Sequence, residues 1–173
     1  MSSSYTIPLS GLKEGHHTFD FEIDKEFFEQ FEESEVKEGS LIANVEMDKR
    51  SSHLDMLVKV SGSVRISCDR CLEMFSQPVY SNNRLLVKFG KSIEEIDPDI
   101  LSLPPDSYEL DLQQQIYEFI ILALPIKRVH PPDKNGKSTC DPVMLKKLEE
   151  LIVEEENESD PRWDELKKLI NDN

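Results

Sequence analysis

Apolar and polar residues alternate along residues 17–23, 40–48, 53–68 and 78–90, which is the pattern of half-buried β-strands. The longest of these stretches is residues 53–68. Its apolar side chains of one parity are Leu54, Met56, Val58, Val60, Val64 and Ile66. Gly62 interrupts this face and indicates a bend or a bulge. Because no long helix separates the strands, the pattern predicts an antiparallel meander.

Other stretches follow helical spacing. Asp24 precedes a short helix with three phenylalanines, and residues 109–126 carry apolar side chains at i, i+4 and i+7. Asp-Pro pairs begin two further helices, at Asp141 and at Asp160. Residues 5–12 predict a short edge strand, and the proline-containing residues 91–107 and 127–140 predict loops.

Together these elements predict an α+β fold. We expect an antiparallel sheet of about five strands, with helices packed on one side and a C-terminal helical tail. The predicted boundaries are a sheet-based domain over residues 1–140, which includes the central helix, and an acidic helical tail over residues 141–173.

The formal net charge of −15 is spread unevenly along the chain. Basic residues outnumber acidic ones only in residues 59–91 and 125–140, the two regions that contain the cysteines. The electrostatic field of a molecule this negative repels nucleic acid at long range. Contact with RNA therefore requires the two basic regions to meet. The alternative is that the acids keep the protein soluble and the bases are scattered over its surface.

Cys68 and Cys71 form a C-x-x-C pair at the end of the longest predicted strand. Such a pair supplies half of a zinc site, and His130 and Cys140 are the candidates for the other half. The loop between them must fold back for all four to meet. A redox pair is less well supported, because no convincing helix follows the motif. The third interpretation is that the two cysteines are small residues of the core.

Several motifs resemble the YceD family, whose members are described as large ribosomal RNA subunit accumulation proteins. The most specific is the stretch from Gly62 to Glu73, "GSVRISCDRCLE", and "IPLSGL", "ALPIKRVH", "CDPVMLKKL" and "DPRWDELKKL" add to it. In many members further cysteines follow the first pair. Cys140 matches one of them, and His130 stands about where another would be, so the resemblance implies a structural zinc ion.

The resemblance implies a non-enzymatic ribosome-biogenesis factor whose partner is large-subunit ribosomal RNA or a ribosomal or assembly protein. If the ligands converge, the neighbouring bases form one patch that grips phosphates or such a partner. The predicted members of this patch are Arg65, Arg70, Arg84, Lys127, Arg128, Lys134 and Lys137. The alternative is an adaptor or chaperone whose acidic helices dock a basic ribosomal protein.

Nothing in the sequence points to a membrane or to an enzyme. Residues 1–10 lack the features of a secretory signal, no apolar run approaches the roughly 20 residues that span a bilayer, and three cysteines fit a reducing compartment. No phosphate-binding glycine pattern or nucleophile motif occurs. We therefore expect a cytoplasmic protein with neither catalytic residues nor a small-molecule substrate.

Overall fold

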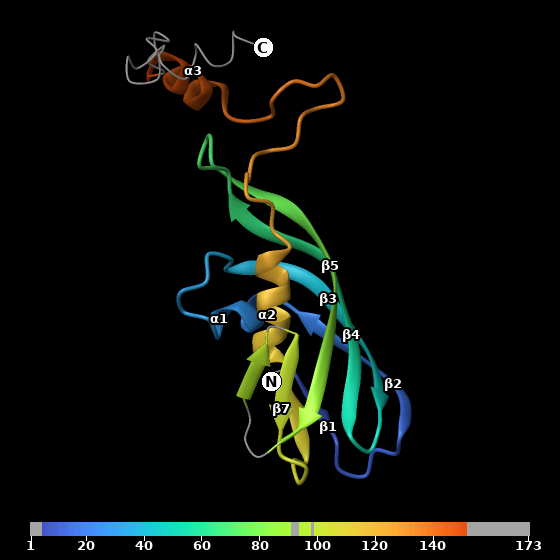
Figure 1. Cartoon of the computed structure of the whole chain (residues 1–173). Coiled ribbons are helices and arrows are strands. Elements are labelled where there is room, and N and C mark those ends of the chain that lie inside the picture. Colours follow the sequence, from blue (N-terminus) through green and yellow to red (C-terminus); the bar gives the residue numbers. More distant parts are fainter. Residues whose placement is uncertain (1–4, 91–93, 98, 152–173) are drawn as a thin grey trace, which may run out of the picture.

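The computed structural model describes residues 5–90, 94–97 and 99–151, and Figure 1 shows their arrangement. The strands of this part of the chain are β1 (Thr6–Pro8), β2 (Gly15–Ile23), β3 (Glu38–Lys49), β4 (His53–Ser67), β5 (Met74–Phe89), β6 (Glu94–Asp97), β7 (Ile100–Leu103) and β8 (Glu109–Asp111). The helices are α1 (Lys25–Glu29), α2 (Gln113–Leu122) and α3 (Pro142–Leu151). The predicted α+β class is confirmed.

The main sheet has six strands in the order β2-β3-β4-β5-β7-β6. The four strands from β2 to β5 pair antiparallel with their sequence neighbours, as the alternation predicts. However, β7 pairs parallel to β5, so the expectation of a purely antiparallel sheet is wrong. After β5 the chain forms β6 at the edge of the sheet. It then returns as β7, which lies between β5 and β6.

The prediction of an uninterrupted loop over residues 91–107 is also wrong, because this segment contains β6 and β7. Each strand has only four residues, too few for a period-two pattern to stand out beside acidic residues and prolines. Tertiary contacts decide the matter, since Ser102 and Leu103 are buried. The predicted edge strand near the N-terminus is shorter than expected and pairs with β8 in a separate two-stranded sheet.

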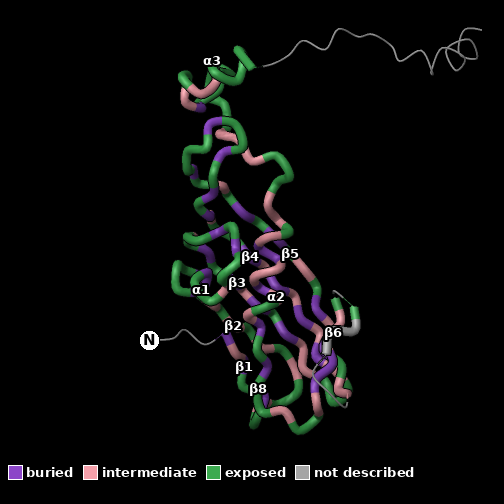
Figure 2. The backbone as a smooth tube through the Cα atoms, turned by 90° about the vertical axis from the view of Figure 1, so that its left-hand side faces the viewer, coloured by how far each residue is buried: buried purple, intermediate pink, exposed green. Residues whose placement is uncertain are grey.

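One face of the main sheet forms the core. Burial alternates along β3, β4 and β5, and Figure 2 shows this alternation along the backbone. Figure 1 shows α1 and α2 on the same face of the sheet, where α2 buries Ile116 and Phe119. The carboxylate of Asp24 caps α1 by accepting the N–H of Glu26 at 2.9 Å, as predicted. The other face of the sheet, which we call the outer face, is open to solvent.

β4 and β5 form a long hairpin whose turn projects beyond the end of β3. The chain that leaves α2 runs toward this turn and continues into α3 (Figure 1). The predicted start of α3 is confirmed, because the carboxylate of Asp141 accepts the N–H of Val143 at 3.0 Å. None of the residues of α3 is buried. The helix predicted from Asp160 lies outside the described residues, and the domain boundary at residue 140 stays a prediction.

Candidate metal centre

The turn between β4 and β5 carries the first two candidate ligands, Cys68 and Cys71. Two backbone hydrogen bonds close it, from the N–H of Cys68 to the carbonyl of Glu73 and from the N–H of Leu72 to the carbonyl of Cys68, each at 2.9 Å. The N–H of Arg70 donates to the sulfur of Cys68 at 3.5 Å. Both cysteines are buried, although they lie at the end of a hairpin.

The chain that leaves α2 returns to this turn and supplies His130 and Cys140. Two reciprocal hydrogen bonds hold the segments together. The N–H of Asp69 donates to the carbonyl of Arg128, and the N–H of Arg128 donates to the carboxylate of Asp69, each at 2.7 Å. Asp69 therefore places His130, two residues beyond Arg128, beside the cysteine pair.

The loop between His130 and Cys140 folds back, as the prediction of a common site requires. The carboxylate of Asp133 accepts the N–H of Lys137 at 2.8 Å, and the N–H of Asp133 donates to the carbonyl of Lys137 at 2.8 Å. Gly136 turns the chain with a φ of 78°, a value at which a side chain would be strained. The turn brings Cys140 back toward the hairpin.

The four candidate ligand atoms lie within 4.8 Å of one another. The sulfurs of Cys68 and Cys140 are 3.7 Å apart, and the Nδ1 atom of His130 lies 3.4 Å from the sulfur of Cys71 and 3.7 Å from that of Cys140. Zinc bonds of about 2.3 Å to sulfur and about 2.0–2.1 Å to nitrogen give tetrahedron edges of about 3.8 Å (S to S) and about 3.6 Å (S to N). The three distances match these edges within about 0.2 Å.

The cluster is enclosed rather than open to solvent. Cys68, Cys71 and Cys140 are buried, and all three are free thiols. The ring of Phe75 covers His130, with 4.8 Å between the ring centroids. A metal bound by all four side chains would have its tetrahedral shell filled and would leave no position for a substrate or a water, as in structural sites.

Two of the thiols have shifted pKa values. Burial raises the pKa of Cys68, but hydrogen bonds from the backbone N–H groups of Cys71, Arg70 and His130 and from the His130 ring lower it more, to about 6. Burial raises the pKa of Cys71, backbone hydrogen bonds from Asp141 and Glu73 oppose this effect, and side-chain hydrogen bonds with Cys68 and Cys140 raise the pKa further. Of these two thiols, Cys68 is the one more readily present as the thiolate, the form that binds metal.

Most of the predicted basic residues lie on the same segments as the four candidate ligands. Five of the seven lie on the hairpin turn or on the loop that meets it, namely Arg70, Lys127, Arg128, Lys134 and Lys137. Arg65 lies two positions before the end of β4 and forms an ion pair with Glu38 at 4.0 Å. Arg128 is also paired, with Glu35.

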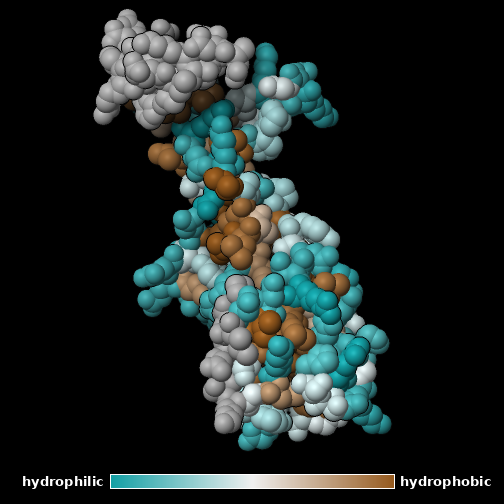
Figure 3. All heavy atoms as spheres, in the orientation of Figure 1, coloured by the Kyte–Doolittle hydropathy of each residue, from teal (hydrophilic) through white to brown (hydrophobic). Residues whose placement is uncertain are grey.

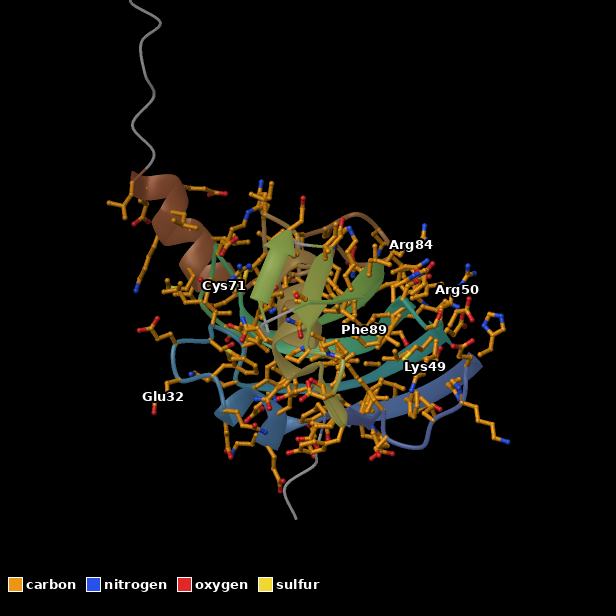
Figure 4. All side chains as sticks on the ribbon, turned by 60° about the horizontal axis from the view of Figure 1, so that its bottom comes forward. Glu32, Lys49, Arg50, Cys71, Arg84 and Phe89 are labelled. Carbon is orange, nitrogen blue, oxygen red and sulfur yellow. The ribbon has the colours of Figure 1, made fainter. Side chains whose placement is uncertain are left out.

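Arg84 does not belong to this group, which corrects the predicted patch. It lies opposite Leu57 in the β4–β5 register, whereas the hairpin ends at the pair Ser67 and Met74. Ten positions along a strand correspond to about 33 Å. Figure 4 shows Cys71 and Arg84 at opposite ends of the sheet. Arg84 instead forms a two-bonded ion pair with Asp55, with N–O distances of 2.8 and 2.5 Å.

Sequence reasoning did not find Asp69, Phe75 or Leu72 as parts of this centre. Asp69 stands between the cysteines, but nothing in the sequence shows that its carboxylate holds the distant Arg128 segment. Phe75 follows the alternation of β5 and gives no sign that it covers a histidine. Leu72 adopts a φ of 63°, and because the residue is not a glycine, no local pattern indicates this conformation.

The fold and the cluster define a class of protein: an α+β domain with three cysteines and one histidine gathered at the end of a long hairpin. A family model described as "Large ribosomal RNA subunit accumulation protein YceD" matches residues 56–170. The chain therefore belongs to the YceD family, as its motifs predict. The comparisons with curated proteins and with solved structures gave no match. No described helix has the length and apolar character that a membrane span requires.

Proposed function

We propose that this protein supports the accumulation of large-subunit ribosomal RNA as a non-catalytic assembly factor of the cytoplasm. The family match supports the process. In this proposal a zinc ion bound by Cys68, Cys71, His130 and Cys140 joins the hairpin turn to the loop after α2. The observation that carries it is the convergence of these four ligand atoms from segments about sixty residues apart.

The chemistry of the donors favours zinc over other metals. Thiolate and imidazole ligands in a tetrahedral arrangement suit zinc, whereas magnesium and calcium take oxygen ligands in larger shells. A closed set of four protein ligands stabilises a fold and leaves no open position for catalysis. The proposed role of the metal is therefore to hold the binding surface in place.

The basic residues around the cluster supply that surface. Arg70, Lys127, Lys134 and Lys137 form no ion pair with any other described residue, in contrast to Arg65 and Arg128. Phosphates of RNA or acidic groups of an assembly partner fit such a surface. The acidic remainder of the molecule limits non-specific binding to RNA.

The metal is tested on the purified full chain by elemental analysis and competition with a chromogenic chelator. We expect about one zinc ion per chain, and a much weaker site in Cys140→Ser. His53→Ala is the matched control, because His53 lies at the opposite end of the hairpin. A chain that copurifies with no metal and takes up none from zinc salts contradicts the proposal.

The surface is tested by charge reversal. Arg70→Glu with Lys127→Glu should weaken binding to large-subunit ribosomal RNA and reduce the salt dependence of binding, and the same variant should fail to restore ribosomal RNA levels in cells that lack the protein. Arg84→Glu is the control, because Arg84 lies at the far end of the sheet. Unchanged binding and restoration in the Arg70 variant would refute this role.

A second candidate function is an acidic adaptor for a basic ribosomal protein. The observations that favour it are the net charge of −15 and α3, a helix that buries none of its residues. Tight binding of a basic ribosomal protein that survives charge reversal at Arg70 and Lys127, together with no RNA binding, would select this alternative.

A further inference from the structure

The main sheet has an open edge near its middle, because β5 is much longer than the strand beside it. β5 has 16 residues and pairs on one side with β4 from Met74 to Lys88. On its other side β7 pairs only with residues 86–89, and Figure 1 shows β7 beside one end of β5. The described part of the chain places no strand on that side of residues 74–85.

Hydrogen bonds at the two ends of β5 show which of its backbone groups face this side. The carbonyl of Glu73, directly before β5, accepts the N–H of Cys68 at 2.9 Å, so odd-numbered residues face β4. The N–H of Leu86 donates at 2.9 Å to the carbonyl of Asp99, directly before β7, so even-numbered residues face the other side. The β4–β5 register has no shift, and the assignment therefore holds along the whole strand.

Three residues thus present unpaired backbone groups to that side, namely Tyr80, Asn82 and Arg84, which we call the open edge. Their N–H groups donate to no described residue, and the carbonyls of Tyr80 and Asn82 accept from none. Both ends of the open edge are defined, because Pro78 has no N–H and the N–H of Leu86 is already bonded. Proteins usually protect such edges, so a short stretch without protection indicates a contact site.

A hollow lies beside the open edge on the outer face. It has a volume of about 300 Å³ and is lined by Arg84, Leu86, Asp99 and Ile100. Leu86 and Ile100 give it an apolar lining, and the guanidinium of Arg84 is held by Asp55. The hollow therefore favours an apolar side chain on the outer face of any segment that pairs with the open edge.

The core face beside the open edge is polar instead. Ser81 and Asn83 each have a buried polar side-chain atom, Oγ and Nδ2, without a hydrogen-bond partner among the described residues. Their neighbours on this face of β5, Val79 and Leu85, are apolar and buried. Because buried polar groups are normally hydrogen-bonded, these two atoms favour a polar side chain on the core face of the added segment.

We propose that an extended segment of another protein adds to the main sheet as a strand at the open edge. Figure 3 shows apolar side chains gathered over the end of α2 and the chain that leaves it, but an apolar surface alone selects no particular kind of partner. The open edge does so, because it offers both donors and acceptors with a repeat of about 6.7 Å, which matches an extended polypeptide. Phosphates of RNA supply acceptors only.

This inference goes beyond the proposed function and requires neither a metal nor RNA. The open edge is centred on Asn82, eight positions along β5 from Met74 at the hairpin turn, which corresponds to about 26 Å. The segment alternates an apolar side chain toward the hollow with a polar side chain toward Ser81 and Asn83. Main-chain hydrogen bonds supply the affinity, and this alternation supplies the specificity.

A second copy of this chain does not fit the same place. In the antiparallel register that pairs the open edge with itself, Asn82 lies opposite Asn82 of the second copy, and Leu86 lies opposite Pro78 of the second copy. The residues before Pro78 in the second copy would then coincide with β7, which already pairs with β5 there. A short segment that ends at this point avoids the overlap.

The experiment measures amide exchange by nuclear magnetic resonance in the full chain, with and without a pool of acetylated seven-residue peptides. In the pool valine, leucine or phenylalanine alternates with serine, threonine or asparagine, and a lysine is added at each end for solubility. Without peptide the amides of Tyr80, Asn82 and Arg84 should exchange fast. Millimolar peptide should slow their exchange several-fold.

Asn82→Pro removes an N–H from the open edge and keeps the pairing with β4, because the backbone groups of Asn82 face away from β4. It should weaken peptide binding several-fold. Thr18→Pro is the matched control on the free edge of β2, where the carbonyl of Glu22 accepts from the hydroxyl of Tyr5 instead of from β3. This control should bind peptide as the native chain does.

A second pool, methylated on its backbone nitrogens, tests the same hydrogen bonds on the native chain and replaces Asn82→Pro if that variant loses its native circular dichroism. Methylation should abolish the protection. These measurements contain no RNA and do not depend on zinc, so their failure is distinguishable from failure of the proposed function.

Four outcomes overturn the inference. The first is slow exchange of the three amides in the free chain at every protein concentration, which means that the chain itself covers the edge. The second is slow exchange that is lost on dilution, which means that a second copy occupies it. The others are no protection by the peptide pool, and protection that survives both Asn82→Pro and methylation.

Discussion

Gly62→Ala should destabilise the fold more than Gly15→Ala, although both glycines have backbone angles that disfavour side chains. The φ of Gly62 is 148° and that of Gly15 is 121°. The two positions differ in space. A Cβ atom at Gly62 would lie 2.3 Å from the carbonyl oxygen of Ser40 and 2.6 Å from the Cα of Leu41, whereas nothing lies within 4 Å of one at Gly15.

The magnitude follows from two contributions. Backbone strain of a non-glycine residue costs about 1–3 kcal/mol and applies to both variants. Forcing a methyl group against the backbone of β3 adds a further cost of about 1–3 kcal/mol at Gly62 alone, because two paired strands cannot separate locally without loss of ladder hydrogen bonds. The change in unfolded-chain entropy is the same in both variants and cancels. We expect Gly62→Ala to lose about 2–6 kcal/mol and Gly15→Ala about 1–3 kcal/mol.

The assay is urea unfolding of both variants and the native chain, followed by far-ultraviolet circular dichroism. This signal reports on the sheet, whereas Trp163 lies outside the described residues. Equal m-values are required for the comparison of the two free energies of unfolding. If Gly62→Ala is no less stable than Gly15→Ala, the close approach of β3 and β4 at this position is refuted.

Three further predictions concern the hairpin and the cluster. The hydrogen bond from Arg84 lowers the pKa of Asp55, so this pair stabilises the fold above the ordinary carboxylate pKa and loses its effect as the pH falls through the lowered value. Asp55→Asn should thus be less stable than the native chain at about pH 7 and equally stable at about pH 2. Urea unfolding at the two pH values measures this, and a difference in urea midpoint that is the same at both contradicts the prediction. Asp69→Ala should weaken zinc binding about 10- to 100-fold in a chelator competition. Glu73→Ala should leave zinc binding unchanged, because the Glu73 carboxylate forms no hydrogen bond or ion pair with any other described residue. Chelation of zinc should speed amide exchange in residues 127–141 and spare the central strands, and equal protection with and without metal would exclude the cross-link.

Strands with one buried face could be predicted from the sequence because their pattern is local. Val58 and Val60 are two positions apart, so they lie on the same face of β4, and both are buried. The four clustered side chains could also be proposed from the sequence, because a close cysteine pair directs attention to the few other cysteines and histidines as partners. Convergence of His130 and Cys140 with that pair depends on the Asp69–Arg128 contact, which no local pattern encodes.

The errors have a common physical origin in long-range pairing. β7 joins β5 in parallel, and parallel neighbours carry no hairpin signal between them. Arg84 and Arg65 look equivalent as bases near a cysteine pair in the sequence. In an antiparallel hairpin, however, positions at equal distance from the turn meet, so Arg84 lies opposite Leu57 and far from Cys68. Charge counted over a segment of sequence therefore overestimates what a single surface contains.

The metal that we propose at the hairpin end would answer a specific weakness of this fold. β3 pairs with β4 only as far as the residue opposite Arg65, so the turn beyond it rests on two strands, and isolated two-stranded ribbons are marginal in water. The hairpin side chains buried beyond this point are Ile66, Cys68, Cys71 and Phe75, a small apolar set beside Cys140. Ligand bonds to the proposed metal would supply stabilisation there without a larger core. The side chains of Arg70, Lys127, Lys134 and Lys137, which form no ion pair with a described residue, would then stay exposed beside a rigid turn.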